Sequence, residues 1–281
     1  MIRRSMRRVV SRRVDALRQI DHWGAEVATV AVLRDGDVLA SRGARDVTLA
    51  WASISKPFAA LATLIAAEEG VIDLDDPAGP EGATIRHLLS HASGLPFKGA
   101  KPIAPPGRRR IYSNTGIEAL ASTLEGAAEM PFGDYLRAAV IEPLGMSAEL
   151  RGSPAAGIRG TLDDLIAFAR ELVSPTLVAP ETVAEMTSVQ FPGLPGVLPD
   201  IGRFEPNDWG LGVELRDGKH PHWTGTRNSP GTFGHFGGSG TFLWIDPDAR
   251  LACACLTDRE FDKWALEAWP RISDAILAEA A

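Results

Sequence analysis

The sequence predicts an α+β protein in which an antiparallel sheet is flanked by helices and an all-helical subdomain is inserted into the chain. Segments with strand character lie near both ends, whereas the middle shows helical patterns broken by frequent prolines and glycines. Strands at the two ends with helices between them are expected to pair into one sheet. We therefore expect one domain over residues 1–281, with an α/β subdomain from 1–76 and 206–281 and a helical subdomain from 77–205.

The first element is expected to be an amphipathic helix. Residues 1–18 contain seven arginines and one aspartate, and Val10, Val14 and Leu17 would share the inward face. This arm has no apolar core of the length that a secretory signal needs, so we do not expect such a signal.

Two paired strands and a buried helix are expected next. Residues 26–34 form a β-branched run that ends at Asp35-Gly36, a hairpin signal, so residues 37–42 are expected to pair back on it. The segment 53–69 is apolar on nearly every side and is followed by Gly70, a typical C-cap residue. A helix of this composition is buried, and we expect it to lie between the two subdomains.

The remaining strands lie near the end of the chain. They are expected over residues 209–215, 232–237, 241–246 and 251–257, and a helix interrupted near Pro270 is expected from about residue 261. In the last strand, Cys253 and Cys255 point to the same face and are poorly placed for a disulfide with each other. Buried reduced thiols are typical of a cytoplasmic protein.

Charge and hydropathy exclude some classes of partner. The net charge of −7 gives no support for nucleic-acid binding, and no apolar run is long enough to span a membrane. A small molecule is the expected partner, and the oligomeric state stays open.

The most informative motif is Ser53-Ile54-Ser55-Lys56, which opens the predicted buried helix. Residues three apart share one helix face, so the Ser53 hydroxyl and the Lys56 amine can meet. A serine needs a base to become a nucleophile, and a buried lysine can be that base. The chain has only five lysines against twenty-four arginines, and no other Ser-x-x-Lys occurs.

Two further segments follow in order along the chain. Tyr112-Ser113-Asn114 comes after a loop rich in proline and arginine, and His235-Phe236-Gly237-Gly238 lies in a strand-like run. A Ser-x-x-Lys, then Tyr-x-Asn, then a basic residue-x-Gly resembles the signature of the serine β-lactamase and penicillin-binding superfamily, in its class C-like branch. The segments 70–77 and 85–96 also resemble that family's landmarks. The resemblance implies a β-lactamase/transpeptidase-like fold and a catalytic domain that needs no cofactor.

The resemblance also implies roles for these residues. Ser53 would be the nucleophile, Lys56 and Tyr112 a coupled acid–base pair, and Tyr112 would return the proton to the leaving group, with its pKa lowered by the Lys56 ammonium. Asn114 would donate its amide to Lys56 and to a substrate carbonyl. Gly237 would let substrate lie close to the strand edge, and the N–H groups of Ser53 and Gly238 would form the oxyanion hole.

At one position the chain departs from the penicillin-recognising pattern. Those enzymes carry Lys-Thr/Ser-Gly, which binds a substrate carboxylate, whereas this chain has His235 and Phe236. A histidine is only partly charged at neutral pH, and phenylalanine has no hydroxyl. The sequence therefore favours a serine hydrolase acting on small esters or amides. The alternatives are a β-lactamase or D-Ala-D-Ala peptidase and, from another class, a binding or sensor protein with little turnover.

Other clusters are expected to be structural. His87 and His91 are four residues apart, but no third ligand is spaced with them, so capping or core roles are expected and no metal site. His220-Pro221-His222 is expected to be a surface loop. The loops 97–110 and 191–207 are expected to shape the pocket.

Overall fold

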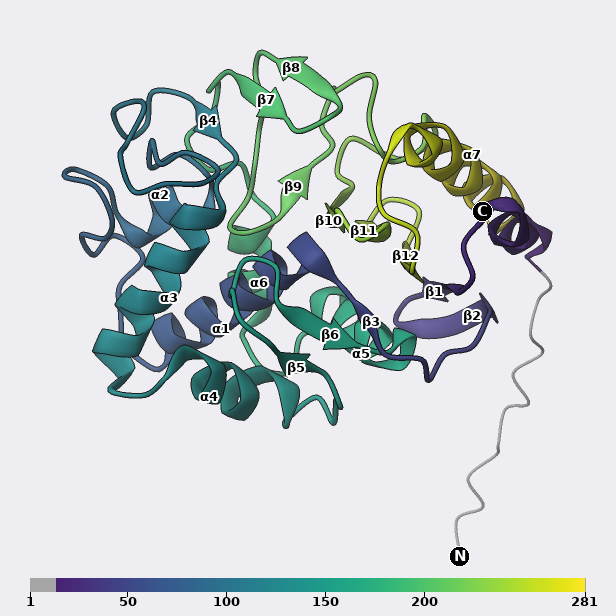
Figure 1. Cartoon of the computed structure of the whole chain (residues 1–281), viewed down its shortest axis with the longest axis horizontal. Coiled ribbons are helices and arrows are strands. Elements are labelled where there is room, and N and C mark those ends of the chain that lie inside the picture. Colours follow the sequence, from purple (N-terminus) through teal and green to yellow (C-terminus); the bar gives the residue numbers. More distant parts are fainter. Residues whose placement is uncertain (1–13, 281) are drawn as a thin grey trace, which may run out of the picture.

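The computed structural model describes residues 14–280 and has an α+β fold built on a six-stranded antiparallel sheet, as expected (Figure 1). The strand order is β2-β1-β12-β11-β10-β9, so strands from the two ends of the chain lie side by side in the centre. The strands of this sheet are β1 (Ala28–Arg34), β2 (Asp37–Arg42), β9 (Glu214–Leu215), β10 (Phe233–Gly237), β11 (Thr241–Asp246) and β12 (Leu251–Thr257).

Both faces of the sheet are buried, which explains why its central strands are apolar at nearly every position. In β1, Ala31 and Leu33 belong to the cluster under the helices on one face, whereas Val30 and Val32 belong to the cluster on the other. Side chains alternate between faces along a strand, so one continuous apolar run fills two cores. Cys253 is buried and reduced, as expected.

Helices and short strands make up the rest. Up to residue 128, the elements outside the six-stranded sheet are η1 (Asp15–His22), β3 (Leu49–Ala50), η2 (Ala52–Ile54), α1 (Ser55–Glu68), α2 (Ile85–Leu89), β4 (Arg110–Ile111) and α3 (Asn114–Ala128). They are followed by α4 (Phe132–Leu136), η3 (Arg137–Ile141), β5 (Glu149–Leu150), β6 (Ile158–Gly160), α5 (Leu162–Val173), α6 (Pro180–Met186), β7 (Gly196–Leu198), β8 (Gly202–Phe204) and α7 (Lys263–Ala280).

These elements cover the sheet in layers. Helices η1 and α7 pack together over one face, and α5 packs against strands of the other (Figure 1). Helix α1 is buried at every position from Ser55 to Ala66, as its composition predicts. The division into an α/β and a helical subdomain stays a prediction, although α5, from the segment assigned to the helical one, lies against the sheet.

The described part of the N-terminal element is a 3-10 helix, η1, rather than the expected α-helix. Val14 and Leu17 are buried as expected, but Leu17 belongs to a 3-10 helix, Val14 is the extended residue just before that helix, and Val10 lies outside the described residues. No helix between residues 14 and 280 combines the length and the apolar character needed to cross a membrane.

Two expected elements differ in the structure. The segment 209–215 is a strand only over β9, because a turn with Gly212 at φ +72° interrupts it. A side chain at Gly212 would collide with Ala60 of α1, so the turn packs directly on that helix. The last helix is not interrupted, and α7 runs through Pro270. Burial of Trp269 and Ile272 holds it together despite the hydrogen bond that a proline removes.

Candidate active site

Ser53 lies in a tight turn that is fixed by hydrogen bonds from residues at the β10–β11 connection. It is the middle residue of η2, and Ala52 before it has a left-handed backbone, with φ at +45°. Such a conformation costs a non-glycine residue about 1–3 kcal/mol, so the surroundings must fix it. Ser239 and Thr241 do so, because their hydroxyls donate to the carbonyls of the two residues before Ala52, at 2.7 and 3.0 Å. The turn leaves Ser53 partly accessible.

Lys56 is placed to exchange a proton with Ser53. Its Nζ lies 2.9 Å from the Ser53 Oγ and 3.0 Å from the carbonyl oxygen of Ala155, and its side chain is 0 % exposed. Burial lowers the pKa of Lys56 from 10.5 to about 7, against a smaller opposing effect of the Glu118 charge. A large fraction of the amine is therefore unprotonated at neutral pH and can accept the Ser53 proton.

Tyr112 follows β4 and lies beside both residues. The Lys56 Nζ is 4.7 Å from the centre of its ring, and Ser53 lies on the side of its hydroxyl. Burial raises the pKa of Tyr112 above its ordinary value, and the nearby Ser53 hydroxyl only partly offsets this. The sequence suggested the opposite direction. The expected lowering required a Lys56 ammonium, and the buried Lys56 is itself only partly charged. Tyr112 is thus a neutral hydroxyl, a proton donor rather than a phenolate base.

His235 is buried in β10 and uncharged. Its Nδ1 lies 2.6 Å from the carbonyl oxygen of Phe236, which can only accept, so Nδ1 carries the proton. The Nε2 atom then accepts from the Tyr112 hydroxyl at 3.4 Å. Burial lowers the pKa of His235 to about 3, with a further contribution from the Lys56 charge. The strand position that holds a lysine in penicillin-recognising enzymes is neutral in this protein.

The remaining predicted residues differ in placement. A side chain at Gly237 would collide with the carbonyl oxygen of Trp51, so this glycine lets β10 approach the turn that carries Ser53, and its role towards substrate stays a prediction. Gly238 has open space around it and faces the cavity that holds Ser53. Its oxyanion role stays a prediction.

Asn114 begins α3 and does not bond to Lys56, whose second partner is the Ala155 carbonyl oxygen instead. The Asn114 Oδ1 is buried and has no hydrogen-bond partner among residues 14–280. The expected Lys56 contact is therefore wrong in this structure, and a role of Asn114 towards substrate stays a prediction.

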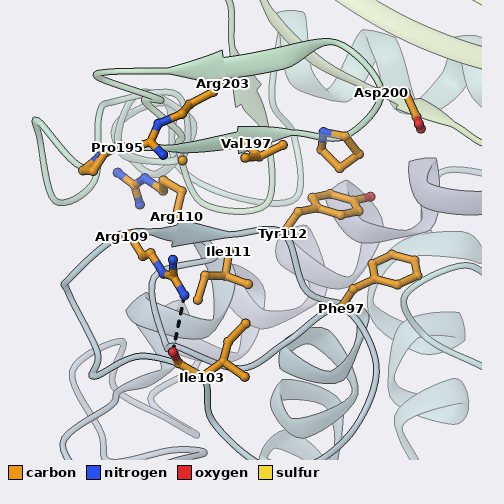
Figure 2. Close-up of a pocket in the computed structure, with 12 residues that line it drawn as sticks. Phe97, Ile103, Arg109, Arg110, Ile111, Tyr112, Pro195, Val197, Asp200 and Arg203 are labelled. Carbon is orange, nitrogen blue, oxygen red and sulfur yellow. Dashed lines mark hydrogen bonds between the residues drawn. The ribbon is translucent and has the colours of Figure 1, made fainter.

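Two hollows lie near Ser53 and share part of their lining, including Phe97 and Tyr112. The nucleophile cavity, of about 140 Å³, is lined by Ser53, Tyr112, His235 and Gly238 among others. The outer groove, of about 640 Å³, lies beyond Tyr112 between the segments 97–112 and 195–203 (Figure 2). The two loops predicted to shape the pocket form the walls of this groove.

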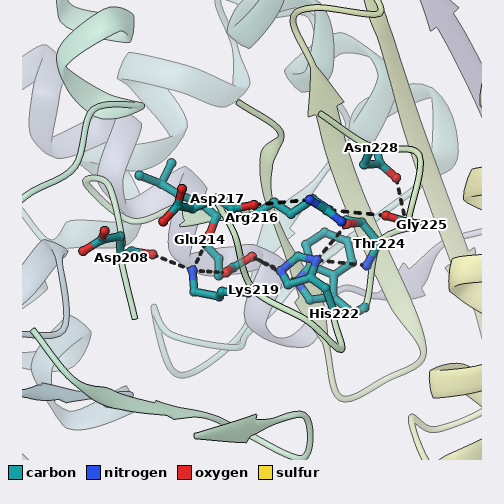
Figure 3. Close-up of polar contacts among 11 residues, drawn as sticks. Asp208, Glu214, Arg216, Asp217, Lys219, His222, Thr224, Gly225 and Asn228 are labelled. Carbon is teal, nitrogen blue, oxygen red and sulfur yellow. Dashed lines mark hydrogen bonds and ion pairs between the residues drawn. The ribbon is translucent and has the colours of Figure 1, made fainter. Parts of the chain in front are cut away.

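A buried ionic cluster behind the nucleophile cavity was missed by the sequence analysis. Glu214 of β9 lines that cavity and accepts hydrogen bonds from Lys219 at 2.6 Å, from Trp223 at 3.1 Å and from the His222 Nε2 at 2.8 Å (Figure 3). Burial by itself raises the pKa of Glu214, but the His222 and Lys219 charges lower it to about 2. His222 was expected in a surface loop and is in fact buried. Its alternation with exposed His220 was the available signal.

The two other histidines support the local backbone. His87 accepts from the backbone N–H of Thr84 at 3.3 Å and completes a capping box at the start of α2. His91 is buried, accepts from the Ser113 N–H at 3.3 Å and packs against the Tyr112 ring at 4.7 Å. His91 therefore helps to fix the segment that carries Tyr112.

Comparison with known proteins gives a consistent result. The β-lactamase family model matches residues 10–148 and 147–276. A crystal structure of a β-lactamase (Mb2281c) from Mycobacterium bovis is 49% identical and superimposes with a TM-score of 0.93, covering 94% of this chain and 99% of that one.

Two more distant relatives agree with this. Penicillin-binding protein 4* of Bacillus subtilis is 32% identical over a match that covers 34% of this chain and only 29% of its own length. EstCE1, a hydrolase with promiscuous acyltransferase activity, shares the fold at 21% identity, with a TM-score of 0.76 over 94% of this chain and 97% of its own. Because the family model matches nearly the whole length, this chain belongs to the β-lactamase family.

Proposed function

We propose that this protein is a serine hydrolase that forms an acyl-enzyme on Ser53 and acts on small esters or amides. The observation that carries the proposal is the 2.9 Å contact between the Ser53 Oγ and the fully buried Lys56 amine, whose pKa of about 7 makes it a base at neutral pH. Serine hydroxyls become nucleophiles when such a base lies within hydrogen-bond distance.

The geometry supports a two-step reaction. Lys56 takes the Ser53 proton as Oγ attacks the substrate carbonyl, and the N–H groups of Ser53 and Gly238 stabilise the oxyanion. Tyr112, neutral and in contact with both Lys56 and Ser53, donates a proton to the leaving group and recovers one from Lys56. Water then attacks the acyl-enzyme with Lys56 again as base, which releases the acid and restores Ser53.

β-Lactam hydrolysis is the second candidate. It is favoured by the 49% identity to a protein described as a β-lactamase. Against it stands the neutral His235, whose pKa burial lowers to about 3, followed by Phe236, so that neither residue offers a charge to a substrate carboxylate. We therefore rank ester or amide hydrolysis first.

A covalent label tests the nucleophile. Intact-mass analysis after reaction with a fluorophosphonate probe is expected to show one adduct on the wild type and none on Ser53→Ala. The neighbouring Ser55, whose hydroxyl accepts from the Ile158 N–H at 2.9 Å, gives the matched control Ser55→Ala, which should still be labelled. An adduct that persists in Ser53→Ala contradicts the assignment.

Turnover separates the two candidate substrates. The wild type is expected to have a higher kcat/KM for p-nitrophenyl butyrate than for nitrocefin. If nitrocefin is the better substrate, the second candidate replaces the first. If Ser53 is labelled but neither compound nor a panel of amides is turned over, a binding protein of this fold is the correct description.

A further inference from the structure

The outer groove is lined by large apolar side chains that are exposed to solvent. Three large apolar residues along it are more than half exposed: Phe97 at 54 %, Ile103 at 56 % and Val197 at 55 %. Phe97 stacks on the Tyr112 ring at 6.0 Å between centres, which joins the groove to the nucleophile cavity. Clustered exposed apolar side chains next to a reactive group mark a binding surface.

The groove walls are held in place without a ligand. Strands β4 and β7 pair in parallel, with Arg110 opposite Gly196, where no side chain would fit. The buried Arg110 guanidinium donates to the carbonyl oxygens of Ser90, Asn207, Gln190 and Phe191. These bonds tie both walls together, so the groove is preformed.

Positively and negatively charged side chains lie at different ends of the groove. Arg109 and Arg203 lie at the end away from Ser53, whereas Asp200 lies at the Tyr112 end and lines both hollows (Figure 2). Neither arginine is in a salt bridge within residues 14–280, and both are exposed. An amphiphilic anion would therefore lie with its charged end at the arginines and its apolar chain towards Tyr112.

The sizes of the two hollows decide which part of the ester enters each. At about 30 Å³ per small group, the nucleophile cavity of about 140 Å³ holds about five non-hydrogen atoms, which suits a short acyl group. In the proposed mechanism Tyr112 protonates the leaving group, so the leaving group lies on the Tyr112 side, where the groove begins. Arg109 is three residues from Tyr112, about 10 Å along an extended strand, the length of about eight methylenes.

We propose that the outer groove binds the leaving group of the substrate, and that the substrate is a short-chain ester of a long ω-hydroxy acid whose carboxylate pairs with Arg109 and Arg203. This inference rests on the proposed acyl transfer at Ser53. It places the carboxylate far from His235, so it does not conflict with the absence of a cation on β10.

Matched esters test the proposal. The compounds are 10-butyryloxydecanoate, its neutral analogue 10-butyryloxydecanamide, and monobutyl decanedioate, in which the anionic tail is on the acyl side. The wild type is expected to favour the first over the second in kcat/KM. Arg109→Gln/Arg203→Gln is expected to lower that ratio about fivefold, and raised ionic strength should lower it as well. Arg108→Gln, at an exposed arginine outside the groove lining, is the control and should leave the ratio unchanged.

Four outcomes decide between the groove assignment and its alternatives. A fall in the ratio confined to the Arg109/Arg203 variant supports the proposal, as does a further loss for both long esters in Val197→Asp. An equal ratio in the wild type and the double variant overturns it. So does an arginine-dependent preference for monobutyl decanedioate, which would put the acyl chain in the groove.

A binding measurement keeps the proposal separate from turnover. Calorimetric titration of Ser53→Ala with 10-hydroxydecanoate, the product alcohol, is expected to show binding that weakens about fivefold when Arg109 and Arg203 are both Gln. If no ester is hydrolysed but this binding is found, the proposed function fails and the groove assignment stands. If esters are hydrolysed and 10-hydroxydecanoate binds equally to both proteins, the groove assignment fails alone.

Discussion

Lys56 and Lys219 are both buried near the nucleophile cavity, but the charges around their amines differ. Lys56 lies beside Ser53, whereas Lys219 contacts Glu214, which lines the same cavity. Within residues 14–280 the Lys56 amine forms hydrogen bonds only with neutral oxygens, those of the Ser53 hydroxyl and the Ala155 carbonyl. Lys219 is 2 % exposed in its side chain and donates to the Glu214 carboxylate at 2.6 Å, as well as to the carbonyl oxygens of Asp208 and Leu215.

The difference shows how burial produces two roles from one residue type. Lys56 forms no ion pair within residues 14–280, and burial lowers its pKa to about 7, as its proposed role as a base requires. The Lys219 amine instead forms an ion pair with the Glu214 carboxylate at 2.6 Å and fixes the position of that side chain, so Lys219 braces β9 against the cavity wall. The counter-charge, more than the depth of burial, separates a reactive lysine from a structural one.

The sharpest way to break this comparison is to make Lys56 a permanent cation. Lys56→Arg is expected to lose about 10²–10⁴-fold in kcat/KM for p-nitrophenyl butyrate, nearly as much as Lys56→Ala, because an arginine does not release its proton. Lys98→Arg, at an exposed lysine, is the control. If Lys56→Arg keeps more than about a tenth of the activity, Lys56 acts only as a charge.

Removing the other lysine should affect stability instead. Lys219→Met leaves Glu214 buried without its lysine partner, which is expected to lower the free energy of unfolding in urea by about 3–5 kcal/mol. Lys219→Met/Glu214→Gln is expected to lose less than Lys219→Met alone, because the unpaired charge is gone. Lys98→Met should stay within about 0.5 kcal/mol of the wild type. A Lys219→Met protein as stable as the wild type would mean that the pair contributes nothing.

The two tyrosines, Tyr112 and Tyr135, allow the proposed proton donor to be compared with a tyrosine outside the site. Tyr112→Phe is expected to slow single-turnover acylation about 10²-fold while the melting temperature changes little, since only a hydroxyl is lost. Tyr135→Phe is a matched control, because the Tyr135 hydroxyl donates to Glu69 at 2.6 Å outside the nucleophile cavity. An unchanged acylation rate in Tyr112→Phe would leave Tyr112 with a packing role only.

The smallest effect is the pH dependence. The reactive form of Lys56 is unprotonated, so kcat/KM is expected to rise with pH through about 7 and then level off. Below that value activity should fall about tenfold per pH unit. Because burial lowers the pKa of His235 to about 3, His235 does not titrate in this range. A flat profile across neutral pH would assign the proton transfer to another group.

Much of the sheet could be predicted from the sequence. The segments 241–246 and 251–257 are strands with the predicted bounds, because two short apolar runs separated by a Pro-containing turn suffice to define them. The segment 209–215 failed because Gly212 turns the chain against Ala60 of α1, and contact with a distant helix leaves no local pattern.

The site could be predicted in its composition but not in its charge states. The motifs identified Ser53, Lys56 and Tyr112, and the structure brings these three together. The raised pKa of Tyr112 depends on which side chains enclose its hydroxyl, and the Glu214–Lys219–His222 cluster depends on how a loop folds back on β9. Both are properties of tertiary packing, which spacing along the chain does not encode.

The burial of Lys56 also lowers the free energy of unfolding of this protein at neutral pH. The pKa of Lys56 is about 7 in the folded protein against 10.5 for the free side chain, so the unfolded chain binds that proton more tightly. Above pH 10.5 the Lys56 amine is neutral in both states, and its burial costs no proton. As pH falls towards about 7, folding must remove a proton that the unfolded chain binds, so the free energy of unfolding decreases. The proposed role of Lys56 as a base accounts for a residue that selection for stability alone would replace.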